Sequence, residues 1–207
     1  SDPVKLSEAL SRAAREHRIN VASFDQEVRP HLDETAVAGR LTTGDSPGPQ
    51  VGVYLNDGTG SKMSYYLRYD AKVSATWCSG GVQGLSGTLS LTSQAPKDAA
   101  RLPSYITGGG AFGTDPGNQL VNVRIYGPVE GEISDVQMDS RPIRAFSAVL
   151  QADRLIATIP VELSPGETAD LTWRMKSGPD QTGATSVDVT PSVVPGQSSS
   201  TVVSACA

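Results

Sequence analysis

Residues 62–78, KMSYYLRYDAKVSATWC, form the longest stretch in which apolar and polar side chains alternate. The odd-numbered positions carry the apolar and aromatic side chains, namely Met63, Tyr65, Leu67, Tyr69, Ala71, Val73, Ala75 and Trp77. A period of two predicts an extended strand with one buried and one wet face, so Trp77 is predicted to face the core. Such a strand would span about 50 Å at roughly 3.3 Å per residue, and we therefore expect a bend or bulge near Tyr69 and Asp70.

The same alternation recurs once before this stretch and repeatedly after it. The further predicted strands cover residues 51–55, 85–91, 121–125, 133–138, 145–150, 155–163, 169–175 and 187–189, with Val193 as a candidate extension. The spacing slips between Ile133 and Val136, which indicates a bulge, and Pro160 predicts that its strand lies at a sheet edge. Trp173 shares the inward parity of Trp77, so the two rings are predicted to pack near each other. Seven or eight strands separated by turn signals are typical of an immunoglobulin-like antiparallel β-sandwich, a mainly β fold.

Residues 1–43 have a different pattern, which predicts a small α/β appendage made of a helix, a strand and a helix. Apolar residues at helical spacing indicate a helix over residues 4–17. The apolar run 19–24 predicts a short strand, and Asp25 would cap a second helix that reaches about Ala38, broken or kinked by Pro30. Because a lone strand leaves its edges unpaired, it should join a sheet in this chain or in an upstream domain.

The Gly- and Pro-rich segment 42–50 marks the expected boundary between this appendage and a sandwich domain over residues 51–207. The chain opens directly on a predicted helix with Asp2 as its N-cap, which indicates a fragment of a longer protein whose targeting segment lies upstream. No apolar run reaches the ~20 residues that a membrane-spanning helix needs. Membrane attachment is therefore expected only through an anchor outside this fragment.

Composition narrows the classes of function. Of the 207 residues 19% are charged and 5% aromatic, and the 21 Gly and 14 Pro fit a turn-rich β protein. The net charge is −5 and the sequence has no basic stripe, which argues against nucleic acid as a partner.

The two cysteines are Cys78, at the end of the long predicted strand on its polar side, and Cys206, one residue from the C-terminus. Both could be buried as free thiols, but a Ser-rich tail that ends in a cysteine favours a disulfide between them. Closing so long a loop would stabilise the fold by about 4 to 5 kcal/mol in the chain-entropy view. A disulfide would also indicate an oxidising compartment.

Residues 94–118 form a long loop, and loops of that length are either functional or held down by other contacts. Its aromatic residues, Tyr105 and Phe112, could stack on a sugar ring or contact a partner protein, although such aromatics more often plug the end of a sandwich. Asp115 and Asn118 add oxygen atoms, but their spacing fits no calcium loop, so we predict no metal site. These four residues are the candidate ligand or partner residues.

The sequence contains no recognisable catalytic constellation. Residues 58–62, GTGSK, resemble part of a phosphate loop but lead into a strand, so a hairpin turn is predicted instead. His17 and His31, the two histidines, lie in the predicted helices without the further ligands that zinc needs. Asp135 and Asp139 could be paired carboxylates, yet their parity places them on the wet face of a strand. We therefore expect no cofactor and no enzyme activity for this fragment.

Several segments point to a known family. They are GVYLNDGTGSKMSYYL, then LPSYITGGG followed by NQLVNVRIYGP, then LSPGETADLTWRM and the closing SAC. In this order they resemble the C-terminal region of a large actinobacterial family of membrane-anchored envelope proteins, defined as a domain of unknown function. The resemblance covers nearly the whole chain and includes no catalytic signature. It implies a transmembrane anchor and an α/β domain upstream, with this part outside the cell. Some relatives of such proteins are associated with surface polysaccharide production.

These observations support two hypotheses. The first is a non-enzymatic extracellular module at the cell surface that presents or binds an envelope component, such as a surface glycan or an envelope protein. The second is an envelope enzyme that acts on glycan or on a phosphate-linked polymer and shares its site with the upstream domain. In that case Arg12, Arg15, Arg18 and Asp25 of the appendage would lie near the cleft.

Overall fold

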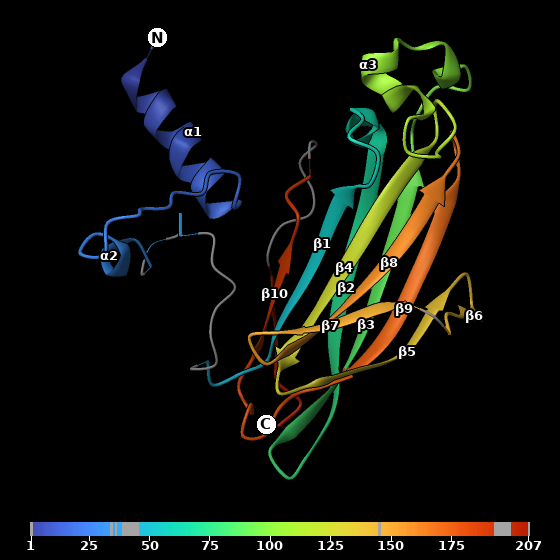
Figure 1. Ribbon diagram of the computed structural model, residues 1–207. Helices are drawn as coiled ribbons and strands as arrows, with labels where there is room; N and C mark the ends of the chain where they lie inside the picture. The colour runs from blue at the N-terminus through green and yellow to red at the C-terminus, as the bar shows by residue number, and fades with distance from the viewer. Residues whose placement is uncertain are drawn as a thin grey trace. The chain divides into compact units, whose positions relative to one another are not determined.

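The computed structural model consists of a β-sandwich and a small N-terminal helical unit (Figure 1). It describes residues 2–33, 35, 37–38, 46–144, 146–192 and 200–206. The chain divides into two compact units, Ser1–Thr42 and Thr43–Ala207. Within the described residues, no helix has the length and apolarity that a membrane span requires.

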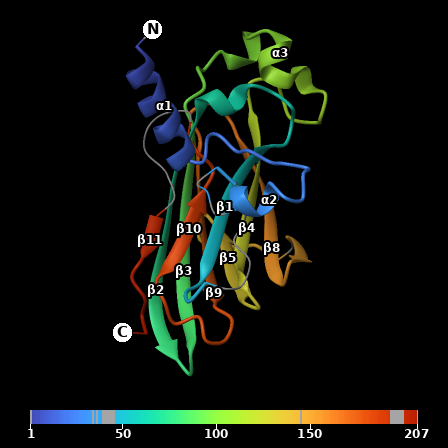
Figure 2. The same cartoon turned by 90° about the vertical axis from the view of Figure 1, so that its left-hand side faces the viewer.

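The larger unit contains two stacked sheets (Figures 1 and 2). Sheet A has six strands in the order β11-β10-β1-β4-β8-β7, and sheet B has five in the order β2-β3-β9-β5-β6. The strands are β1 Gln50–Asp57, β2 Leu67–Ser79, β3 Val82–Ser93, β4 Gln119–Val129, β5 Glu132–Met138, β6 Arg141–Pro142, β7 Ser147–Gln151, β8 Arg154–Leu163, β9 Thr168–Lys176, β10 Thr185–Val189 and β11 Ser200–Val202. Neighbouring strands are antiparallel except for the parallel pair β1 and β10. The predicted mainly β sandwich is confirmed.

The core lies between the two sheets and is filled by the inward residues of each strand. Trp173 on β9 is its largest fully buried side chain, with 1% of its surface exposed, which confirms its predicted core position. Gly87 on β3 lies directly opposite in the ladder, and a Cβ placed there would be 2.1 Å from the indole. The absent side chain of Gly87 therefore provides the room that the Trp173 ring occupies.

The long predicted strand is shorter than expected and irregular at its other end. Met63–Tyr66 form a 3-10 helix, and β2 pairs without a break from Leu67 to Ala75, so the bend predicted near Tyr69 is wrong. The bulge occurs instead between Ala75 and Trp77. One extra residue in a strand exchanges the faces of all residues beyond it. Trp77 therefore lies on the outer face opposite Gly84 and is 44% exposed, and its predicted packing in the core beside Trp173 is wrong.

Two predictions about other strands have mixed outcomes. The slip near Ile133 is confirmed, because the β5–β9 register shifts between Ser134 and Gln137. The edge position predicted for β8 is wrong for the strand as a whole, since β8 lies between β4 and β7. β7 pairs only with the part of β8 that ends at Thr158, so Pro160 lies where this side of β8 has no strand neighbour among the described residues. Ala145 and Val193, parts of predicted strands, lie outside the described residues.

The N-terminal unit contains helix α1, Pro3–Arg15, and Asp2 caps it by accepting a hydrogen bond from the Val4 N–H, as predicted. Residues 19–24 form no strand, so this prediction is wrong. A strand requires a ladder of main-chain hydrogen bonds to a neighbour, and among the described residues this run donates one such bond, from the Val21 N–H to the Val37 oxygen.

The second helix of this unit, α2, is limited to Arg29–Asp33, shorter than predicted. Asp25 caps the turn before it, where its Oδ1 accepts the Glu27 N–H at 2.8 Å. Pro30 lies in the first turn of α2 rather than interrupting a longer helix, because a helix needs no donor from its first residues.

One end of the sandwich is closed by the segment between β3 and β4, which lies at the top of Figure 1. It contains η2 Ala99–Arg101, α3 Ser104–Thr107 and η3 Gly108–Gly110. Its small core consists of Met63, Ala95 and Ala99, against which Tyr66, Leu102 and Ile106 pack.

Candidate functional site

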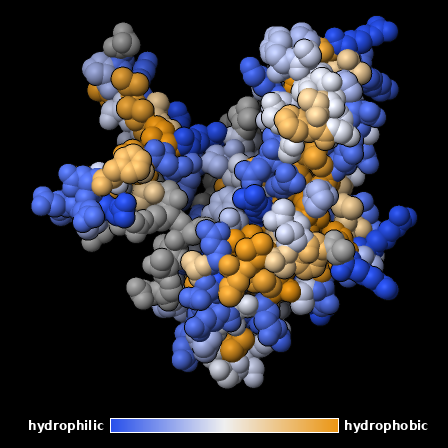
Figure 3. Space-filling view, in the orientation of Figure 1, coloured by the Kyte–Doolittle hydropathy of each residue, from blue (hydrophilic) through white to orange (hydrophobic). Residues whose placement is uncertain are grey.

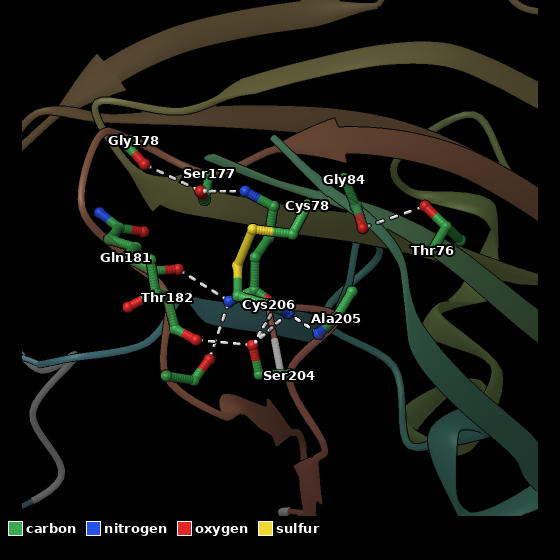
Figure 4. The surroundings of a disulfide bond; sticks show 12 residues. Thr76, Cys78, Gly84, Ser177, Gly178, Gln181, Thr182, Ser204, Ala205 and Cys206 are labelled. Carbon is green, nitrogen blue, oxygen red and sulfur yellow. Dashed lines mark hydrogen bonds between the residues drawn. A yellow bond between two sulfur atoms is a disulfide. The ribbon is translucent and has the colours of Figure 1, made fainter. Parts of the chain in front are cut away.

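The end of the sandwich opposite α3 is held by a disulfide between Cys78 and Cys206, as predicted (Figure 4). The Sγ atoms are 2.09 Å apart and the two residues are 128 positions apart in the chain. The bulge in β2 turns Cys78 to the inner face, opposite Gln83, and not to the polar face on which its parity had placed it. A disulfide is typical of proteins from oxidising compartments.

Gln83 fixes the C-terminal tail beside this bond. Its side chain is fully buried, and its Nε2 donates to the main-chain oxygens of Gln181 and Gly183 at 2.7 and 2.8 Å. Its Oε1 accepts from Ser204 Oγ and from the Ala205 N–H, both at 3.0 Å. This end is a structural clamp, since the Gln83 amide is fully engaged in holding the tail.

The predicted loop aromatics are at the other end, near α3, and do not plug it. Tyr105 is 65% exposed and Phe112 is 67% exposed, whereas the buried Met63 closes this end. The plugging interpretation is therefore wrong for both aromatics. Lys62 Nζ lies 5.3 Å from the Tyr105 ring centroid, and the Lys62 N–H donates to the carbonyl of Ile106 at 2.8 Å.

Asp115 and Asn118, the polar members of the predicted set, have local roles. The Asn118 N–H donates to the main-chain oxygen of Asp115 at 3.0 Å, which closes a turn. The Asn118 side-chain amide donates to Glu162 on β8 at 3.0 Å. The structure thus joins Asp115 to Asn118, and it joins Tyr105 to Lys62. The described residues include no group of three or more His, Cys, Asp or Glu side chains arranged to hold a metal ion.

The outer face of sheet B carries a hollow that the sequence did not indicate. Its volume is about 480 Å³, and an adjoining hollow of about 290 Å³ shares Ser86, Asp135 and Arg174 with it. We call the combined depression the Trp77 groove. It is lined by Thr76, Trp77, Leu85, Ser86, Ser134, Asp135, Gln137, Thr172, Trp173, Arg174, Met175 and Lys176.

Two β-bulges on separate strands direct side chains into this groove. The bulge in β2 turns Trp77 outward, and the bulge in β5 contains Asp135, whose φ of +50° lies in the left-handed region. Bulges are frequent next to functional sites, where they redirect a side chain. Asp tolerates a left-handed backbone better than most residues, but the conformation is still uncommon and points to a local requirement.

The Trp77 ring rests on the sheet. A Cβ on Gly84 would be 2.0 to 2.6 Å from the ring atoms Nε1, Cε2 and Cδ1, so the indole occupies the space above this glycine. The ring nevertheless remains 44% exposed. It therefore has one side supported by the β3 backbone and another open to solvent, which is the geometry of a stacking platform.

Charged side chains along β9 and β5 flank this platform and balance each other. Arg174 Nε is 3.7 Å from Asp135 Oδ2, and Lys176 Nζ is 2.9 Å from Glu132 Oε2. All four are more than half exposed, so each retains groups that can bind a ligand. Together with the hydroxyls and the Gln137 amide, the groove offers both donors and acceptors without a net charge from these pairs.

The outer face of sheet A carries a different polar feature, around Arg154 on β8. This arginine is 3% exposed and donates to the main-chain oxygens of Gln50 and Gly127. Burial raises the pKa of the nearby Tyr54 to about 12, with Asp188 adding to the effect, and it lowers the pKa of Arg154. These hydrogen bonds connect β8 to the start of β1, and they satisfy the donors of the buried guanidinium, so Arg154 has a structural role.

The remaining sequence candidates do not assemble into a catalytic site. Asp139 Oδ1 accepts the Asp170 N–H at 2.9 Å, so it supports the β5–β9 ladder rather than forming a pair with Asp135. Residues 58–62 form a turn in which Asp57 accepts from Thr59 at 2.7 Å. In the N-terminal unit, Arg18 forms an ion pair with Glu16 at 2.6 Å. Arg12 and Arg15 lie in the last turn of α1.

The chain is thus defined by its fold and site as a disulfide-bonded β-sandwich with a candidate binding face on sheet B. Comparisons with protein-family models and with curated proteins found no match.

Proposed function

We propose that this chain is a non-catalytic extracellular module of the cell envelope that binds glycan through the Trp77 groove. The observation that carries the proposal is the convergence of two bulged strands, which place an exposed indole and an Asp–Arg pair in one depression. The β5 bulge lets both Ile133 and Val136 face the core, and the β2 bulge turns Cys78 inward to its disulfide; the same two irregularities direct Asp135 and Trp77 outward into the groove.

The chemistry of the groove suits a sugar chain. A pyranose ring has a face of C–H groups that packs on an aromatic ring, and hydroxyls at its edge that both donate and accept hydrogen bonds. Trp77 offers the first surface, while Asp135 and Arg174 offer an acceptor and a donor beside it. Because strands lie about 4.8 Å apart, the groove extends roughly 14 Å from β2 across β3 and β9 to β5, which suits a short stretch of a linear glycan.

The setting supports the extracellular part of the proposal. The disulfide is typical of an oxidising environment, and the resemblance to membrane-anchored envelope proteins implies the same location. In this view an anchor and a further domain outside this chain attach the module to the membrane, and its partners are surface glycan and other envelope components.

Binding to a panel of neutral and acidic envelope polysaccharides, measured by affinity electrophoresis and calorimetry, tests the proposal. We expect Trp77→Ala to weaken binding at least about fivefold, because a stacked ring contributes on the order of 1 kcal/mol or more. Tyr65→Ala is the matched control, since Tyr65 is 61% exposed and lies outside the groove. Equal affinity of wild type and Trp77→Ala for every glycan that binds would refute the role of the groove.

The loop aromatics and the catalytic alternative need separate measurements. A double variant, Tyr105→Ala with Phe112→Ala, tests whether the exposed loop end contributes to binding. Release of reducing ends or phosphate from the bound polymer tests for turnover. Sustained release by this chain alone would refute the non-catalytic assignment.

A further inference from the structure

Strand β7, Ser147–Gln151, is the outermost strand of sheet A and is unusually apolar for that position. All five of its residues are exposed, with Val149 at 55% and Leu150 at 69%. Figure 3 shows a hydrophobic patch at the place that β7 occupies in Figure 1. The strand, SAVLQ, has no charged residue.

Its apolar side chains are on both faces. Leu150 pairs with Leu155 and Ala148 with Ala157, so these two lie on the core side of sheet A. Val149 pairs with Ile156 on the other side. An added strand alongside β7 would therefore cover apolar surface above and below the sheet, in addition to pairing the main-chain groups of the open edge.

Other stretches of sheet edge in the described chain carry features that discourage strand addition. β2 has its bulge and the charged residues Arg68, Asp70 and Lys72. The free part of β5 is also bulged and charged, β6 has 2 residues and β11 has 3. The part of β8 that β7 leaves uncovered contains Pro160.

β7 has none of these protections. It has no proline, no charge and no register shift in its pairing with β8. An unprotected apolar edge is a pairing site for another strand. Because the other described sheet edges, unlike β7, are very short or carry bulges, charges or a proline, we infer that β7 has a partner.

We propose that β7 pairs with β7 of a second copy of this chain, in antiparallel orientation about Val149, to form a two-fold symmetric dimer with a sheet that continues from one subunit to the other. A two-fold axis makes the strand its own complement. Val149 then faces its symmetry mate, Ala148 faces Leu150, and Ser147 faces Gln151, so apolar side chains meet and no like charges are opposed.

Light scattering coupled to size exclusion, over a wide range of protein concentration, tests the dimer. The wild type should approach twice its monomer mass of 21.6 kDa as concentration rises. Val149→Lys should lower the association constant at least about tenfold, because it places a charge against its own symmetry mate. Val203→Lys is the matched control, since Val203 is 82% exposed and lies outside β7, and it should associate as the wild type does.

Hydrogen exchange identifies the surface that is used. The β7 amides should exchange more slowly as the dimer forms, and this protection should be absent in Val149→Lys, whose thermal unfolding should match that of the wild type. A wild type that stays monomeric at all concentrations would overturn the proposal. So would a dimer in which β7 gains no protection.

Discussion

Two glycines on β3 provide a paired prediction about the two tryptophans. Gly84 lies under Trp77 and Gly87 lies under Trp173, and neither glycine has a positive φ. Alanine at either position would place a Cβ about equally close to an indole ring, at 2.0 Å in one case and 2.1 Å in the other. Gly84→Ala and Gly87→Ala therefore add the same methyl group on the same strand, in the first case under the exposed ring of Trp77 and in the second under the buried ring of Trp173.

The expected costs differ because only one ring can move. Trp173 is 1% exposed and enclosed by the core, so Gly87→Ala overpacks the interior, which typically costs about 1–3 kcal/mol. Replacing a glycine by alanine also lowers the conformational entropy of the unfolded chain, which stabilises the fold by about 0.4–1 kcal/mol. We therefore expect a net loss of about 1–2 kcal/mol, and a Tm lower by about 2–8 °C for a domain of this size.

Gly84→Ala should leave stability within about 0.5 kcal/mol of wild type, because Trp77 can swing into solvent. That movement displaces the platform, so glycan binding should fall as it does in Trp77→Ala. Thermal and urea unfolding give the stabilities, and calorimetry gives the affinity. Equal destabilisation by both substitutions would refute this account of the two rings, and unchanged binding by Gly84→Ala would refute the platform.

Three further predictions concern stability. Replacing Cys78 and Cys206 together by serine removes a link across 128 residues and should cost about 5 kcal/mol, or about 10–20 °C in Tm; a change of under about 2 °C would contradict this. Gln83→Ala leaves several buried partners without their hydrogen bonds and should cost about 3 kcal/mol in urea unfolding, whereas a neutral effect would show that the clamp is dispensable. The folded state raises the pKa of Tyr54 from 10.0 to about 12, so the Tyr54 hydroxyl loses its proton at a lower pH in the unfolded chain than in the folded one. The free energy of unfolding should therefore fall as pH rises across that interval. The loss should be on the order of 1 kcal/mol for this partly exposed group, and Tyr54→Phe, compared with wild type at both ends of the interval, should abolish it.

Much of the sandwich could be predicted because a half-buried strand shows its inward face directly in the sequence. β9 is the clearest case, with Ala169, Leu171, Trp173 and Met175 all buried and the residues between them exposed. The sequence shows less clearly which strands pair with each other within a sheet. The parallel contact of β1 with β10 joins residues more than a hundred positions apart, and no local pattern reports it.

The groove was missed because parity arguments fail beyond a bulge. Nothing in the run from Ala75 to Cys78 breaks the alternation, so Trp77 read as a core residue. One signal was present: Cys78 was expected to form a disulfide with the C-terminal tail, yet its parity placed it on the wet face. Shifting the register by one residue resolves that conflict and turns Trp77 outward at the same time. The exposure of Tyr105 and Phe112 was equally invisible, since a loop has no period from which to infer a face.

The disulfide also affects how the chain responds to proteolysis. A single cut of the main chain anywhere between Cys78 and Cys206 leaves two pieces that are still covalently joined. Of the eleven strands in the described part of the chain, that interval contains nine entirely, β3 to β11, and only β1 and most of β2 lie before it. A nicked molecule outside the cell would thus keep both sheets, and the groove between β2 and β5, in one particle until the bond itself is reduced.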